Sequence, residues 1–223
     1  MSSKIYSIIL ILILTSGLCF SQNGRAKFST GLQVGYNKGF GFQLNFLVSD
    51  FAEGFPFSAK LGAGFTMLDP GNAPDARRIF INDATNGTPE ESGRFYDLRL
   101  DFLYKIKLLG MKKAFVSLGP RFTMFNGNFN FVGGNEDFDI TTNQWGIGAG
   151  FETYFPISSS IDLLFNFGYD YFFSSALKGH DTSYSPDGEN VNPRRDYDYK
   201  TADKAINQPK HNPRAMIGFS YSL

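Results

Sequence analysis

The chain has 223 residues with 21 basic and 21 acidic side chains, so it has no net charge that would attract nucleic acid. It is rich in glycine and aromatic residues, with 24 Gly, 25 Phe and 11 Tyr, yet its mean hydropathy is only −0.19. Beyond the first 21 residues, no stretch reaches the roughly 18 consecutive apolar residues of a membrane helix. This combination favours a protein that crosses a membrane with β-strands.

The N-terminus has the pattern of a secretory signal peptide. Lys4 supplies the positive charge, residues 5–14 form the apolar region, and residues 19–21 form a small-x-small cleavage site. We therefore expect a signal peptide over 1–21 and a mature domain over 22–223.

Cys19 raises the alternative of a lipoprotein signal. Leu18 stands before it, however, where the lipidation motif prefers a small residue. Cleavage after residue 21 would remove this cysteine, which is the only one in the chain. The mature protein would then have neither disulfides nor thiolate metal sites.

Eight segments alternate between apolar residues and small or polar ones with a period of two, which predicts β-strands. They span residues 27–37, 40–49, 57–67, 96–108, 116–124, 145–155, 161–173 and 214–223. In the fourth segment, Leu98 and Leu100 alternate with Arg99 and Asp101. A water-facing surface would not be so apolar, and a dry core would reject these charges. We expect an all-β fold, an eight-stranded antiparallel transmembrane barrel with lipid outside and a polar lumen inside.

The lengths of the connections support this topology. The long ones, 69–93, 126–143 and 174–212, would all lie on one side of the membrane, and the shorter ones, 49–56, 109–113 and 156–160, on the other. Outer-membrane barrels have long external loops and short periplasmic turns. Within the segments, Pro120 cannot donate to a strand ladder and predicts a β-bulge.

The C-terminal segment ends in a pattern typical of outer-membrane proteins. Gly218, Tyr221 and Leu223 resemble the terminal signal by which barrel-assembly machinery recognises its clients. With the signal peptide and the eight segments, the mature chain resembles the small outer-membrane barrels of Bacteroidetes-type Gram-negative bacteria, the PorT-like family. Members of that family have been linked to type IX secretion. The resemblance implies an outer-membrane location and, as one alternative, an accessory role in such a secretion system.

Charged residues on the inward face form the first candidate site. They are Lys60, Arg99, Asp101, Lys105, Arg121, Glu152, Asp162, Asp170 and Arg214. They would form either an ion-pair network that fills the lumen or a path for ions. Eight strands enclose room only for side chains or one small ligand, and an unpaired charge there would be costly, so we favour the filled lumen. The inward glycines leave a narrow wet cavity as an open alternative.

The last long connection holds the second candidate site. Its tyrosines and arginines, Tyr184, Arg194, Arg195, Tyr197 and Tyr199, suit recognition of a protein partner or of lipopolysaccharide phosphates. The only histidines, His180 and His211, also lie there. The surrounding sequence has no hydrolase motif and no calcium-loop spacing. We therefore expect a solvated surface of mixed charge, with no cofactor and no metal.

Together these patterns predict a non-enzymatic outer-membrane barrel that acts as a scaffold or interaction protein through its external loops. The alternatives are an accessory part of a type IX-like secretion system, a narrow small-solute channel and a lipid-modifying barrel enzyme. A soluble lipocalin-like barrel, with apolar residues inside, is the alternative fold.

Overall fold

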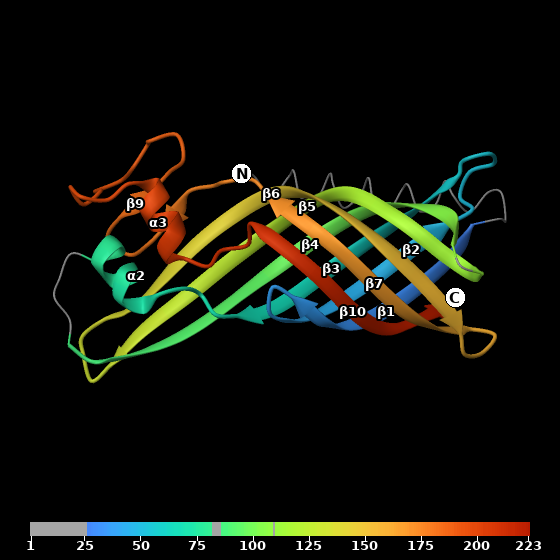
Figure 1. Ribbon diagram of the computed structural model, residues 1–223, viewed down its shortest axis with the longest axis horizontal. Helices are drawn as coiled ribbons and strands as arrows, with labels where there is room; N and C mark the ends of the chain where they lie inside the picture. The colour runs from blue at the N-terminus through green and yellow to red at the C-terminus, as the bar shows by residue number, and fades with distance from the viewer. Residues whose placement is uncertain (1–25, 82–85, 109) are drawn as a thin grey trace, which may run out of the picture.

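A computed structural model describes residues 26–81, 86–108 and 110–223, and its antiparallel sheet closes into an eight-stranded barrel (Figure 1). The predicted signal peptide, 1–21, lies outside the described residues. The barrel strands are β1 (Lys27–Asn37), β2 (Phe40–Ser49), β3 (Phe57–Leu68), β4 (Thr88–Leu108), β5 (Met111–Val132), β6 (Asp137–Pro156), β7 (Ile161–Phe172) and β10 (His211–Ser222). Strand β10 pairs with both β7 and β1 and so closes the barrel. The predicted fold is confirmed.

The two faces of the barrel wall differ as a membrane requires. Outward-facing Leu44, Leu118 and Phe219 are 62%, 55% and 57% exposed, although they are apolar. Their inward-facing neighbours Gln43 and Ser117 are buried. An apolar outer face and a polar interior are typical of a lipid-embedded barrel. The lipocalin-like alternative is wrong, because it requires the opposite arrangement.

Three neighbouring strands, β4, β5 and β6, extend well beyond the rest of the barrel (Figure 1). The predicted loop 126–143 is therefore wrong, since most of it is strand. At this point the apolar residues change from the outward face of the sheet to its inward face. Met124 is outward and apolar, whereas Phe125 and Phe129, above it, are inward and buried. The outward side of the extension instead carries asparagines such as Asn128, so we place the outer boundary of the lipid near Met124.

The extension supports a compact cap. Against its inner face pack α2 (Ala73–Phe80), β8 (Leu177–Lys178), β9 (Ser183–Tyr184) and α3 (Tyr199–Ala205). Figure 1 shows both helices at this end of the barrel. Asn72 begins α2 by accepting a hydrogen bond from the Asp75 amide, and the apolar side of the helix is buried. Neither helix in the described ranges is long and apolar enough to span a membrane.

A shared hydrophobic core holds the cap together. It contains Ala73, Ala76, Ile79, Phe80, Ile81, Phe95, Phe125, Phe129, Phe131, Phe138, Ile140, Leu177, Tyr184, Ala202, Ala205 and Ile206. The expectation that 174–212 forms only a solvated surface is therefore wrong. The connection folds because it buries its apolar residues against the extended strands.

Pro120 does not produce the predicted bulge. The β4–β5 register is the same at Arg99↔Arg121 and at Phe102↔Leu118, on either side of the proline. The irregularity lies between Ile106 and Leu108, next to the turn. Pro120 still pairs with Ile147 of β6 on its other edge. The missing N–H therefore leaves the register unchanged.

The seam between β1 and β10 depends on Gly218. This glycine faces inward, and a Cβ added there would overlap the carbonyl oxygen of Leu32 in β1. We predict that Gly218→Ala lowers barrel stability by roughly 1–3 kcal/mol, because the two strands must move apart. The temperature at which the compact form disappears on a heat-modifiability gel measures this loss, with Ser220→Ala on the same face as control. Normal stability after refolding in detergent, with failure only in cells, would instead show that Gly218 acts as an assembly signal.

Candidate functional site

The lumen is crossed by a layer of buried charges centred on Asp170 of β7. Its carboxylate accepts hydrogen bonds from three arginines on three other strands: from Arg99 Nη1 at 3.0 Å, Arg121 Nε at 2.8 Å and Arg214 Nη1 at 2.7 Å. All four side chains are buried. Charge-assisted hydrogen bonds of this kind are the strong ones, so one carboxylate ties β4, β5, β7 and β10 together.

Three more carboxylates complete the layer. Arg121 Nη2 donates to Asp101 Oδ1 at 2.6 Å, and Arg99 also pairs with Asp97. Lys60 pairs with Glu152, which also accepts from the Tyr154 hydroxyl at 2.9 Å. The buried layer thus contains four cations, Lys60, Arg99, Arg121 and Arg214, and four carboxylates, Asp97, Asp101, Glu152 and Asp170. Its formal charge is zero, which makes a filled lumen energetically acceptable.

Most of the predicted lumen residues come together in this layer, but Lys105 and Asp162 do not. Lys105 is exposed, and Asp162 pairs with the half-exposed Lys113 at 2.7 Å. Both lie at the mouth of the barrel, where β1 begins and β10 ends. Leu103, two residues before Lys105 on the same face, is fully buried and lies between Lys105 and the charged layer. The alternation gave the correct face for Lys105 but did not give its depth. Asp97 belongs to the charged layer but was not among the predicted lumen residues, although the same alternation places it on the inward face.

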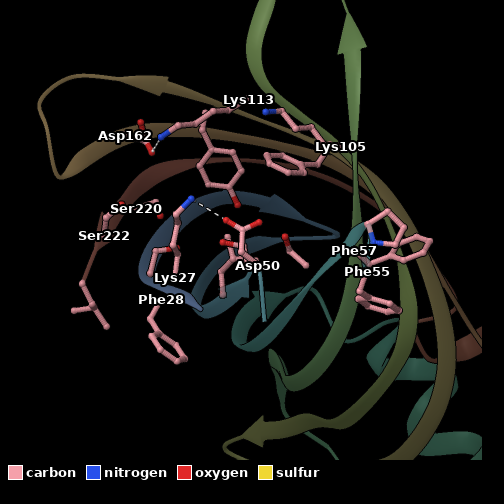
Figure 2. A pocket seen from close by; sticks show the side chains of 18 residues that line it. Lys27, Phe28, Asp50, Phe55, Phe57, Lys105, Lys113, Asp162, Ser220 and Ser222 are labelled. Atoms are coloured by element: carbon pink, nitrogen blue, oxygen red, sulfur yellow. Dashed lines mark hydrogen bonds and ion pairs between the residues drawn. The ribbon is translucent and has the colours of Figure 1, made fainter. Parts of the chain in front are cut away.

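The mouth of the barrel contains an open vestibule of about 520 Å³ (Figure 2). Short turns identify this as the periplasmic end. Lys27 pairs with Asp50 at 2.8 Å, and Lys113 pairs with Asp162. Lys105 also lines the vestibule and has no ion pair within the described part of the chain.

Two of the five candidate residues in the last connection, Tyr184 and Arg194, bind to the backbone of the cap. Tyr184 is fully buried and donates to the Ile79 carbonyl at 3.0 Å. Arg194 Nη1 donates to the carbonyls of Arg78 at 2.8 Å and Ile81 at 2.6 Å. These two side chains hold the last connection against α2. The buried Tyr184 presents no surface to a partner, whereas Arg194 is partly exposed and its role in recognition stays a prediction.

The remaining three candidates differ in exposure. Tyr197 and Tyr199 are partly buried against the cap core, whereas Arg195 is exposed. The histidines lie apart from this cluster: His180 contacts Asp181 at 2.7 Å, and His211 contacts the Tyr169 hydroxyl at 2.5 Å.

A lysine in the β1–β2 turn connects the barrel rim to the cap. Lys38 Nζ donates to the carbonyl oxygen of Gln208 at 2.5 Å. Burial lowers the pKa of this ammonium to about 8, while nearby Asp203 acts in the opposite direction. Within the described residues, no group of three or more His, Cys, Asp or Glu side chains is arranged to hold a metal ion.

Comparisons with protein-family models and with curated protein sequences give no match. Among solved structures, the chain is similar to a major outer membrane protein from Thermus thermophilus. The two share 26% sequence identity, the match covers 89% of this chain and 99% of that one, and the TM-score is 0.72. The closed barrel, its apolar outer face and this likeness define the protein as an outer-membrane β-barrel. Membership of the PorT-like family stays a prediction.

Proposed function

We propose that this protein is a non-enzymatic outer-membrane barrel that acts as a scaffold or interaction protein through its external cap. The observation that carries the proposal is the contrast between its two parts. The lumen is filled by a neutral network of buried ion pairs, whereas the external connections build a folded unit with its own core. A filled lumen disfavours transport, and a folded cap presents a preorganised surface.

An exposed segment of the cap, residues 185–195, is the contact surface that the geometry favours. The hairpin around Gly188 and the segment that follows it carry Val191, which is 57% exposed, and the exposed Arg195. Hydrogen bonds from the buried Tyr184 and the partly exposed Arg194 to the backbone of residues 79 and 81 hold this part of the chain in place. A partner would therefore meet Arg195 and Val191 with little ordering cost, and arginine is a residue type that is enriched in interface hot spots.

Site-specific cross-linking in the native bacterium tests this surface. A photo-reactive amino acid at position 191 or 195 is expected to give a discrete protein adduct. The same residue at lipid-facing position 44 should give lipid adducts alone. An adduct with a secretion component would support the accessory secretion role, whereas lipopolysaccharide adducts alone at 191 and 195 would contradict a protein partner.

Electrical recording tests the other half of the proposal. Purified protein in planar bilayers is expected to show little or no conductance, because the charged layer closes the lumen. Large, stable single-channel steps would contradict the scaffold proposal and favour the small-solute channel.

A further inference from the structure

We propose that the periplasmic vestibule is a binding site for an organic carboxylate that carries an aromatic or aliphatic group. This site lies at the opposite end of the barrel from the cap and is independent of the cap's proposed function. It is built from three features: a lysine without an ion pair, serine hydroxyl donors and an apolar floor.

The positive charge comes from three strands that meet at the mouth. Lys27, Lys105 and Lys113 line the vestibule together with two carboxylates, Asp50 and Asp162. Both carboxylates are already bonded to lysines, at 2.8 Å and 2.7 Å. Lys105 is the cation left over among these lining residues, and an incoming carboxylate would neutralise it.

Several hydroxyl groups provide further donors around this charge. Ser29, Ser58 and Ser220 line the same space. Figure 2 shows Lys105 and Lys113 in the upper part of the view, with the Lys27–Asp50 pair below them. A carboxylate accepts several hydrogen bonds at once, so a site with lysine and serine donors suits it.

The floor of the vestibule is apolar. Phe115 lies directly across the β4–β5 ladder from Lys105 and packs edge-to-face on Tyr154, with ring centroids 5.7 Å apart. Leu47 also lines the space, and Leu103, two residues before Lys105 in β4, is buried. A simple inorganic anion would leave these groups without a partner. An acid with an apolar group would use both halves of the site.

The size of the vestibule sets the class of ligand. Its volume of about 520 Å³ lies within the roughly 300–1,000 Å³ of small-molecule sites. That space suits a molecule of the size of an acylated amino acid, or the carboxyl end of a peptide. Both sources carry the same recognition chemistry, a carboxylate next to an apolar side chain.

Calorimetric titration of the refolded, detergent-solubilised protein with N-acetylphenylalanine tests the proposal. We expect saturable binding with a dissociation constant on the order of 1 mM or lower. N-acetylphenylalanine amide, which lacks the carboxylate, should bind at least about tenfold more weakly. A peptide that ends in phenylalanine, used as free acid and as amide, distinguishes the sources: binding of its acid form assigns the site to peptide ends, and exclusion of the peptide assigns it to small acids.

Variants of Lys105 separate recognition from folding. Lys105→Met should weaken binding of N-acetylphenylalanine about tenfold, and Lys105→Arg should restore most of it. The matched control is Lys107→Met, two residues along β4, because Lys107 is exposed but does not line the vestibule. Unchanged heat-modifiability shows that each variant is folded. Equal binding of acid and amide, full binding by Lys105→Met, or no saturable binding up to about 10 mM would each overturn the proposal.

Discussion

Replacing Leu118 with arginine is expected to prevent stable insertion of the barrel, whereas arginine at Asn128, on the same face of the same strand, is expected to be tolerated. Leu118 is apolar, 55% exposed and faces lipid. A charge there costs roughly 2–4 kcal/mol near the middle of the bilayer. Asn128 lies beyond the polarity change and already donates to Asp137 at 2.8 Å and to Asp139 at 3.0 Å. An arginine at 128 would face water and meet the same two carboxylates.

Heat-modifiable migration and recovery in the outer-membrane fraction measure both outcomes. Leu118→Phe is the control for a change of shape without charge. Leu100→Arg, at a lipid-facing position of β4, should fail as Leu118→Arg does. Normal assembly of Leu118→Arg would show that the faces are assigned wrongly, and failure of Asn128→Arg would place the lipid boundary higher than Met124.

The sequence predicted the barrel because the alternation repeats in every wall strand, but it missed the extension of β5 and β6. The apolar residues change faces between Met124 and Phe125. A search for one continuously apolar face therefore ends there. Asn126 and Asn128 also resemble loop residues by composition, because asparagine is depleted in strands. The available signal was the spacing of Phe125, Phe129 and Phe131, which keeps a period of two on the other face.

The cap was not predictable for a different reason. Helices α2 and α3 have 8 and 7 residues, too few for a clear helical period. Their stability comes from partners far away in the chain. The bond from Tyr184 to the Ile79 carbonyl, for example, joins positions 105 residues apart. Local pattern identified the tyrosines and arginines of the last connection, but only the packing shows which of them are buried.

The charged layer was predictable in part. A period of two gives the face of each charge, so Arg99, Asp101 and Arg121 were correctly placed inside. It gives neither their depth nor their partners, because these depend on the register between strands. Asp170 could not be singled out as the centre of the layer, since its three arginines come from β4, β5 and β10.

That central position makes Asp170 the residue whose loss should cost the barrel most. In Asp170→Ala, three buried arginines lose a partner, and the layer changes from neutral to one excess positive charge. Removing one side of a buried ion pair typically costs about 3–5 kcal/mol. The midpoint of urea unfolding in lipid vesicles, followed by the heat-modifiable band, measures the loss. Asp162→Ala on the same face of β7 is the control, with an expected effect of at most about 1 kcal/mol, because its partner Lys113 is half-exposed.

A double variant shows whether charge balance is the cause. In Asp170→Ala with Arg214→Ala, each remaining cation keeps one carboxylate: Lys60 keeps Glu152, Arg99 keeps Asp97 and Arg121 keeps Asp101. The double variant should therefore lose clearly less stability than the sum of the two single variants, a coupling expected for residues of one network. Additive losses would mean that Asp170 and Arg214 contribute independently, through packing, and that neutrality of the layer does not hold the lumen together.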